Sequence, residues 1–390
     1  MSKPVAIIAV GQTRHGRRDD VSFPELVREA VQSCLADGGV DMEQVDAVVT
    51  GSMPAPMEGV EAPELWLSDV LGMGARPRPL LRVATCGTTG MSIAHAAYYH
   101  VASGLYDLVL AVGMEKMYQN DPQGTMATIG DPIIQRPFIG GALTMFALQC
   151  QEYIQACPVP EDRVREAAAR ISVRSHRDAI ANPYAHIKMD IDVGSVLNSR
   201  LVCYPLRLLD CCPSSDGACA LLFVSQEIAR KLCPIPAWVK GVGYAGDEYW
   251  LADKTWVPWE SARAAARAAY RMAGIRDPLK ELDVAELYIP FTFMEMLLYE
   301  EFGFCERGRG YELVEAGVPE RTGALPIAPS GGVLCTNPIG ATGLLRVGEA
   351  ALQIMGRAGP HQIPGARTAM AHALGGTAQL NGIMIMSQTL

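Results

Sequence analysis

One short stretch decides the fold assignment: residues 81–90 read Leu81-Arg-Val-Ala-Thr-Cys86-Gly-Thr-Thr-Gly90. These small residues lead directly into an Ala-rich run that begins at Met91 and is typical of a helix. A thiol at a helix N-terminus lies near the positive end of the helix dipole, which lowers the pKa of the thiol. The N–H groups of the same turn can also donate to a developing oxyanion. We therefore interpret Cys86 as a nucleophile, with a buried structural cysteine as the alternative.

Outside this elbow, short apolar runs alternate with helical patterns. Such alternation predicts an α/β fold with buried strands. The patterns predict strands at 5–10, 45–50, 108–112, 217–225, 237–244, 284–289, 368–374 and 382–387, and helices at 23–35, 86–103, 262–273, 293–302 and 339–354.

The two halves of the chain are weakly similar. Residues 35–51 and 272–288 both read as a helix end, a glycine turn, a polar link and an apolar strand. A second helix opens at Thr336-Asn-Pro-Ile-Gly-Ala-Thr-Gly343, as one does after Cys86. We predict an N-terminal half over 1–230 and a C-terminal half over 231–390, with both helix starts at one site. An insert at about 115–213, rich in Met, Tyr and Pro, is expected to form a lid.

Composition excludes several classes of function. The net charge of −9 over 390 residues argues against nucleic acid as a partner. No apolar stretch approaches the length of a membrane span. The 11 cysteines are odd in number and form no CxxC pair, which argues against a metal site and favours a reducing, cytoplasmic location. Cys211-Cys212 is expected to form a structural turn.

Four further side chains could carry chemistry. His372 precedes a glycine pair, Gly375-Gly376, and is a natural general base for a thiol, although a lone histidine is often structural.

Asn337 stands at the start of the second helix, where Pro338 would occupy the first helical position and Asn337 would be the N-cap. A cap and a role in the site are compatible. Tyr288 ends a predicted strand and either faces the crevice where α/β proteins bind ligands or packs in the core. Cys335 is a candidate second thiol, with a buried inert thiol as the alternative.

These motifs resemble the thiolase superfamily, and most closely the sterol carrier protein X-type thiolases, over essentially the whole chain. The motifs are the Cys86 elbow, Gly113-Met-Glu-Lys-Met117, Asn182-Pro-Tyr-Ala185, Cys212-Pro-Ser-Ser-Asp-Gly-Ala218, Pro338-Ile-Gly-Ala-Thr-Gly343 and His372-Ala-Leu-Gly375. The resemblance implies two similar βαβαβαββ halves in a five-layer α-β-α-β-α sandwich, usually a homodimer. It also implies acyl-CoA substrates, coenzyme A as co-substrate and no covalently bound cofactor.

Three positions depart from the thiolase pattern. Thr336-Asn337-Pro338 stands where thiolases carry Gly-His-Pro, and Tyr288-Ile-Pro-Phe291 stands where they carry Asn-Glu-Ala-Phe or His-Asp-Cys-Phe. Ala373 stands where many carry a second catalytic cysteine. A strand-end tyrosine resembles the branch with the steroid side-chain retro-aldolases and the benzoylsuccinyl-CoA thiolase subunit. Members of that branch often work with a small zinc-ribbon and OB-fold partner, which would give a heterotetramer.

The resemblance implies a thiolase-type acyltransferase that cleaves or forms a C–C bond in a bulky or aromatic 3-oxoacyl-CoA through an acyl-Cys86 intermediate. Backbone N–H groups of Cys86 and of Gly375 or Gly376 would stabilise the oxyanion.

In the same mechanism, Asn337 and Tyr288 would hold the thioester oxygen, and His372 would act as the base. Cys335 or Tyr288 would protonate the enolate. The alternatives are a retro-aldolase acting on a 3-hydroxyacyl-CoA, with Tyr288 as acid and base, and a non-catalytic scaffold subunit that binds acyl-CoA.

Overall fold

In the part of the chain that the computed structural model describes (residues 3–53, 57, 59–74 and 76–390), nine strands form one mixed sheet. Their order is β3-β2-β4-β7-β1-β8-β11-β10-β9. The first half supplies β1 (Val5–Gln12), β2 (Ala47–Gly51), β3 (Leu80–Arg82), β4 (Leu108–Lys116) and β7 (Asp216–Ser225). The second half supplies β8 (Ala237–Gly246), β9 (Val284–Glu286), β10 (Thr368–Gly375) and β11 (Leu380–Ser387).

The two halves have the same strand order when each is followed outward from their junction. They join where β1 pairs with β8 at Ala6–Trp238 and Ile7–Ala237. From there, β7-β4-β2-β3 on one side matches β11-β10-β9 and a bridge at Ile327 on the other. This order agrees with the internal repeat read from the sequence. The predicted boundary near residue 230 falls in α8 (Gln226–Leu232), between the two sets of strands, and stays a prediction.

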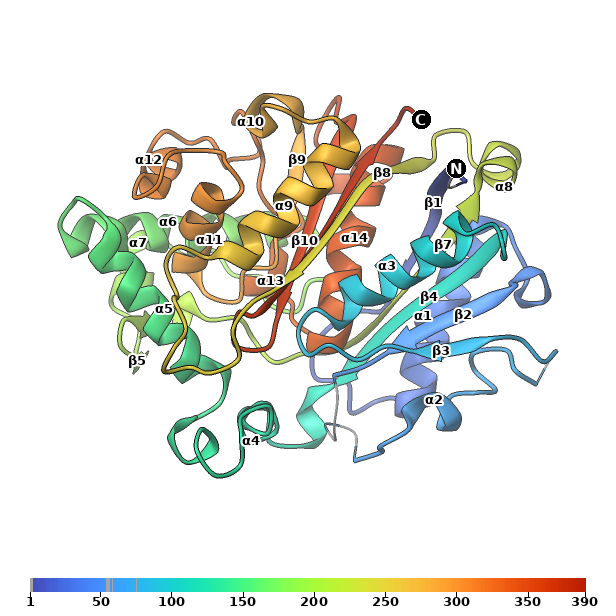
Figure 1. Cartoon of the computed structure of the whole chain (residues 1–390), viewed down its shortest axis with the longest axis horizontal. Coiled ribbons are helices and arrows are strands. Elements are labelled where there is room, and N and C mark those ends of the chain that lie inside the picture. The colour runs from blue at the N-terminus through green and yellow to red at the C-terminus, as the bar shows by residue number, and fades with distance from the viewer. Residues whose placement is uncertain (1–2, 54–56, 58, 75) are drawn as a thin grey trace.

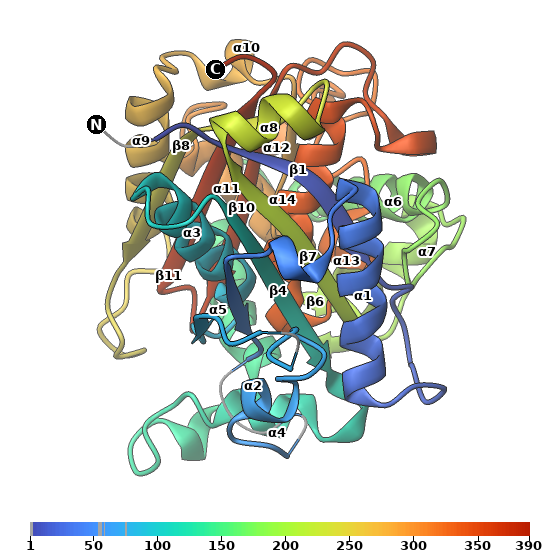
Figure 2. The same cartoon turned by 90° about the vertical axis from the view of Figure 1, so that its right-hand side faces the viewer.

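Four long helices complete five layers. Helix α1 (Phe23–Gly38) covers the outer side of β1 and β7, and α9 (Glu260–Ala273) covers β8 and β11. Helices α3 (Thr89–Ala102) and α14 (Ile339–Met355) lie between the two sets of strands and contact both of them (Figures 1 and 2). The arrangement is therefore the expected α-β-α-β-α sandwich.

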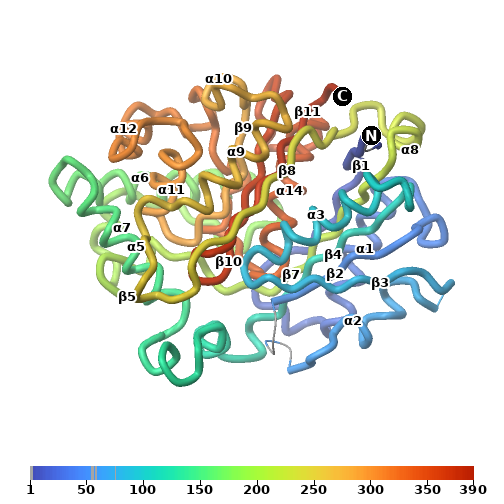
Figure 3. Tube along the Cα trace, in the orientation of Figure 1, coloured from blue at the N-terminus to red at the C-terminus, as the bar shows by residue number. Residues whose placement is uncertain are grey.

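The insert of the first half lies against the second half. It contains α4 (Pro122–Ala127), α5 (Ala142–Ala156), α6 (Glu161–Ala179), α7 (Val193–Leu197), β5 (Leu201–Cys203) and β6 (Leu206–Arg207). Helices α5 and α6 pack on second-half helices: α11 (Thr292–Glu301), α12 (Gly310–Glu315) and α13 (Gly332–Cys335). Figure 3 shows this green segment on the far side of the molecule from the blue strands that precede it. Short helices α2 (Pro63–Trp66) and α10 (Pro278–Glu281) lie in connections.

Helices α3 and α14 touch backbone to backbone at their starts. A Cβ added to Gly90 would lie 2.2 Å from the Leu344 nitrogen, and a Cβ added to Gly343 would lie 2.6 Å from the Met91 nitrogen. Because only glycine leaves room for such an approach, the two helix N-termini converge on one point.

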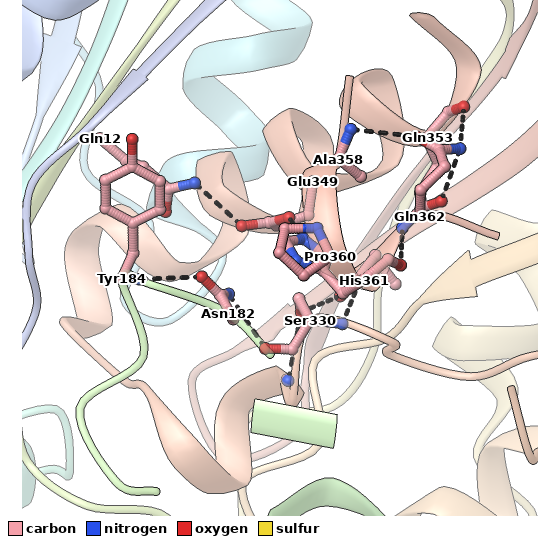
Figure 4. A network of polar contacts seen from close by, with 12 residues as sticks. Gln12, Asn182, Tyr184, Ser330, Glu349, Gln353, Ala358, Pro360, His361 and Gln362 are labelled. Atoms are coloured by element: carbon pink, nitrogen blue, oxygen red, sulfur yellow. Dashed lines mark hydrogen bonds and ion pairs between the residues drawn. The ribbon is translucent and has the colours of Figure 1, made fainter. Parts of the chain in front are cut away.

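Buried polar groups hold α14 in place. Gln12 Nε2 donates to Glu349 Oε1 at 2.9 Å, and His361 Nε2 lies 2.8 Å from Glu349 Oε2 (Figure 4). Burial alone would lower the pKa of His361, but the Glu349 carboxylate raises it above its usual value. In the insert, Asn182 Nδ2 donates to the Ser330 carbonyl at 3.0 Å. The network thus links β1, the insert and the second half around one helix.

No helix in the described residues is both long and apolar enough to cross a membrane. All 11 cysteines are unpaired thiols, and a cytoplasmic location stays a prediction.

Replacing Gly90 by alanine should be strongly destabilising. The added methyl group would collide with the backbone of α14, which cannot move without displacing the core, so we expect a loss of about 3 kcal/mol or more in the free energy of unfolding. Urea denaturation measures this loss. The control is Gly194→Ala in α7, where the nearest atom to the new Cβ is 3.5 Å away. That variant should stay within about 1 kcal/mol of wild type, and equal effects at the two positions would contradict the close crossing.

Candidate active site

Cys86 lies in a sharp turn immediately before α3. Its φ of 55° is in the left-handed region, which non-glycine residues seldom adopt. The Thr88 N–H donates to the Thr85 carbonyl at 3.2 Å and the Thr89 N–H donates to the Cys86 carbonyl at 3.0 Å, so the turn continues into the helix. This geometry presents the thiol to a cavity at the helix start.

The turn after β10 lies directly against this elbow. A Cβ on Gly87 would lie 2.5 Å from the Leu374 carbonyl oxygen, and a Cβ on Gly375 would lie 2.6 Å from the Thr88 nitrogen. The backbone of Gly376 hydrogen-bonds to the Cys86 thiol. The structure therefore brings the predicted glycine pair next to Cys86, where N–H groups can meet a developing oxyanion.

The cavity has a volume of about 190 Å³ and mainly apolar walls. Its apolar side chains come from the insert and from both halves, with four methionines among them. The described lining residues are Met53, Cys86, Gly87, Met117, Gln123, Met126, Ile129, Ala142, Leu143, Met145, Phe146, Cys211, Cys212, Pro213, Ser214, Tyr288, Pro290, Phe291, Asn337, Ile339, Leu374, Gly375 and Gly376.

Burial governs the protonation of Cys86. The loss of water raises the pKa of the thiol above its usual value, and the hydrogen bond from Gly376 only partly offsets this. The lowering that we predicted from the helix N-terminus is therefore not borne out, because desolvation of the thiolate outweighs it.

Asn337 is held by hydrogen bonds at both ends of its amide. Its Oδ1 accepts from Tyr288 Oη at 3.2 Å and from Thr342 Oγ1 at 2.8 Å. Its Nδ2 donates to Cys212 Sγ at 3.1 Å, which leaves the second N–H of that amide for a ligand. The structure brings Asn337 and Tyr288 together in the cavity. Pro338, not Asn337, is the N-cap of α14, so the predicted capping role is wrong.

A buried carboxylate fixes the start of α14. Glu115 Oε2 accepts from the Gly340 N–H at 3.0 Å and from the Met53 N–H at 2.9 Å. A carboxylate at a helix N-terminus is stabilised by the helix dipole. Sequence reasoning missed this residue, although it stands in the Gly113–Met117 motif that follows a strand.

His372 does not reach the cavity. Its Nε2 lies 3.0 Å from Asn381 Oδ1, and its ring packs edge to face on Phe302 at 5.1 Å between centroids. Side chains alternate along a strand, and Ala373 faces α14, so His372 faces the opposite layer. Burial lowers its pKa to about 4. The structure thus does not bring His372 together with Cys86 as the predicted base.

Cys335 also lies outside the cavity. It is fully buried in a cluster with Ala179 and Ala185, and its carbonyl accepts from the Ile187 N–H at 3.0 Å. A different thiol, Cys212, takes the place beside Asn337 that we predicted for a second thiol. The turn that carries Cys212 was expected to be only structural, and its motif, Cys212–Ala218, was the one signal for it.

Family comparisons agree with this geometry. The chain matches the model "Thiolase, N-terminal domain" over residues 5–227 and "Thiolase C-terminal domain-like" over residues 244–388. The chain belongs to the thiolase family. Its fold is the thiolase fold, and its activity class is acyl-CoA C-acyltransferase.

Several relatives of this thiolase have full-length similarity. An acetyl-CoA acetyltransferase of Methanothermobacter thermautotrophicus is 33% identical over 99% of this chain and 100% of its own length. The benzoylsuccinyl-CoA thiolase subunit BbsB of Thauera aromatica is 31% identical over 96% of each chain. Rabbit (Oryctolagus cuniculus) sterol carrier protein 2 is 28% identical over 95% of this chain and 70% of its own length. These matches confirm the resemblance read from the motifs.

A solved structure titled Ltp2-ChsH2(DUF35) aldolase has a TM-score of 0.85 at 24% identity and covers 100% of this chain and 99% of its own. At that identity the likeness shows the fold.

The raised pKa of Cys86 predicts how alkylation of the thiol depends on pH. Because only the thiolate reacts, the rate of Cys86 carbamidomethylation by iodoacetamide should rise about tenfold per pH unit and keep rising past the pH where an ordinary thiol levels off. Mass spectrometry of the Cys86 peptide, with the Cys86→Ser variant to identify it, measures this rate. A plateau already reached near neutral pH would contradict the expectation.

Proposed function

We propose that this thiolase cleaves, or forms, the C–C bond of a 3-oxoacyl-CoA that has a bulky, uncharged apolar or aromatic acyl group, with coenzyme A as co-substrate. The observation that carries the proposal is the Cys86 thiol at the base of an apolar cavity, facing the amide of Asn337. Both groups that the chemistry needs, a nucleophile and an enolate-binding donor, then lie in one desolvated space.

In the cleavage direction, the Cys86 thiolate attacks the 3-oxo carbon of the substrate. The charge that develops on the oxygen is stabilised by the backbone N–H groups of Cys86 and of Gly375 or Gly376. The C–C bond then breaks. Its electron pair passes to the α carbon, and the acyl group stays on Cys86 as a thioester.

The departing CoA thioester is released as an enolate. The second N–H of Asn337 Nδ2 donates to the enolate oxygen, and Tyr288 and Thr342 hold the amide in the orientation that permits this. Coenzyme A then attacks the acyl-Cys86 carbonyl as its thiolate, which yields the shortened acyl-CoA and restores the Cys86 thiolate.

Cavity size and charge support a bulky, uncharged acyl group. An apolar cavity of about 150 Å³ in another protein holds a benzene molecule, and this cavity has about 190 Å³. Its described lining contains no lysine or arginine that could pair with a free carboxylate on the acyl group. Flexible methionine side chains suit a large and irregular apolar group.

The retro-aldol alternative needs a base for the hydroxyl group of a 3-hydroxyacyl-CoA. Tyr288 is the group in position, but burial raises its pKa strongly and its hydroxyl already donates to Asn337. Tyr288 is therefore protonated at neutral pH, and the geometry favours thiolysis.

The test is thiolysis of 3-oxo-3-phenylpropionyl-CoA compared with acetoacetyl-CoA. We expect a higher kcat/KM for the aryl substrate. Cys86→Ser should lower kcat by about 10²-fold or more, because a serine hydroxyl is far less nucleophilic at neutral pH. Cys335→Ala, a buried cysteine outside the cavity, serves as the matched control and should keep wild-type activity.

Two results would contradict this function. Cleavage of the 3-hydroxy compound that survives Cys86→Ser would favour the retro-aldolase. A wild-type protein that binds both 3-oxo substrates and cleaves neither would favour the scaffold subunit.

The sheet edge supports a homodimer. Strand β3 ends the sheet, and Leu81 in it is 43% exposed. An open edge strand can pair with a second copy and so bury its free N–H and C=O groups.

An apolar groove behind the cavity supports a second protein. Phe138 is 85% exposed and Ile134 is 60% exposed, and both line the groove together with Trp250. Met145 lines both the groove and the cavity, so a protein bound there would lie against the wall of the active site. The Thauera relative is named a subunit, and the solved neighbour is titled a complex with a DUF35 protein. We assign this groove to the zinc-ribbon and OB-fold partner.

Native mass spectrometry of the protein from its own host tests both surfaces. Two copies of this chain with two copies of a small partner are expected. Leu81→Asp should give single copies of this chain, because like charges would meet at the joined edge. Phe138→Asp should lose the partner and keep the dimer. Met272→Glu, a polar replacement of a half-exposed side chain on α9, is the control and should change neither, while a monomeric wild type would contradict the dimer.

A further inference from the structure

Cleavage needs an acid, because the enolate must be protonated at its α carbon before it leaves as a CoA thioester. Among the described residues that line the cavity, four side chains carry a titratable proton: Cys86, Cys211, Cys212 and Tyr288. That lining contains no carboxyl group, imidazole or amine. The acid is therefore sought among three thiols and one phenol.

Three of these four protons are already committed. Cys86 carries the acyl group at this stage of the reaction. The Tyr288 hydroxyl donates to Asn337 Oδ1 at 3.2 Å, and the Cys211 thiol donates to the Arg207 carbonyl at 3.2 Å. Cys212 differs, because its sulfur accepts from Asn337 Nδ2 at 3.1 Å and its own S–H has no acceptor among the described residues.

Cys212 is also in the right place. In a thioester enolate, a single carbon separates the oxygen from the α carbon. The oxygen is held by one N–H of the Asn337 amide, and the other N–H of that same nitrogen binds Cys212 Sγ. The thiol therefore lies on the side of the amide where the α carbon must lie.

The turn that carries Cys212 is fixed from two directions. The Cys212 N–H donates to the Pro290 carbonyl at 2.9 Å, and the Asn337 N–H donates to Ser215 Oγ at 3.1 Å. These bonds join the turn to the segment after β9 and to the start of α14, so the thiol and the amide keep a constant distance.

We propose that Cys212 is the acid that protonates the α carbon in cleavage and the base that removes the α proton in the reverse reaction. The proposal rests on the function proposed above. In cleavage, the S–H bond of Cys212 breaks, a C–H bond forms at the α carbon, and the electron pair stays on sulfur. The Cys212 thiolate then takes the proton of the incoming CoA thiol, and the CoA thiolate attacks acyl-Cys86 and releases the Cys86 thiolate.

The electrostatics of Cys212 suit this direction. Burial raises the pKa of Cys212 to about 12, against the opposing effect of the Asn337 hydrogen bond. The thiol is therefore protonated at neutral pH, as an acid for the enolate must be.

Three measurements on Cys212→Ala and Cys212→Ser separate this role from the others. Intact mass after incubation with benzoyl-CoA reports acylation of Cys86, which needs no α proton. Deuterium uptake by acetyl-CoA in D2O reports α-proton transfer alone. Thiolysis of 3-oxo-3-phenylpropionyl-CoA reports the full reaction.

We expect both variants to form acyl-Cys86 to the wild-type extent. Deuterium uptake and thiolysis should fall by about 10²–10⁴-fold, the range for loss of a general acid or base. Cys335→Ala, which removes the other candidate thiol, should leave all three measurements unchanged.

Wild-type deuterium uptake in Cys212→Ala overturns the proposal. So does an equal loss of acylation and deuterium uptake in both variants, which would show that Cys212 only shapes the cavity. A wild-type protein that forms no acyl-Cys86 and cleaves no 3-oxoacyl-CoA overturns the proposed function itself, a result that the variants alone cannot produce.

Discussion

The close approach of α3 and α14 is the constraint on which the site depends. Each helix begins just after a residue that the chemistry uses, Cys86 in one half and Asn337 in the other. With Gly90 and Gly343 in contact, the two helix starts are separated by little more than the thickness of the backbone. Every group placed at those starts must then face the same small space.

Around that point, the apolar walls decide what the polar groups can do. The same desolvation raises the pKa values of Cys86 and Cys212, so both thiols favour the protonated form. A buried thiolate at Cys86 then needs strong local help, and the backbone of Gly376 is the nearest source of it. Dry walls also strengthen the hydrogen bonds that Asn337 offers to a developing charge. The reluctance of the nucleophile to ionise and the stabilisation of the enolate thus have one cause.

The sequence carried the fold class and most of the site. Alternating apolar runs and helical patterns predicted nearly every core element, while the layers came from the family resemblance. Cys86, Tyr288, Asn337 and the Gly375-Gly376 pair were found because each stands at the end of a strand or the start of a helix, where such ends converge.

Two errors have physical causes. His372 was placed in the site because it precedes the glycine pair, but position along a strand does not tell which face a side chain takes. Its neighbour Ala373 packs toward α14, so His372 must point away. Cys212 was missed because its location depends on the Pro290 carbonyl and on Asn337, both distant in sequence. Long-range pairings of this kind leave no local pattern.

The insert leaves the first half at the end of β4 and returns at β7, and those two strands are paired along their whole length. Its entry and exit are therefore adjacent, and everything between them hangs from the sheet at one place. The helices that form the acyl wall can change in length and composition while the elbow, the amide and the glycine pair keep their positions. Substrate range and bond-breaking chemistry are thus carried by separable parts of one chain, and selection can alter the first while it preserves the second.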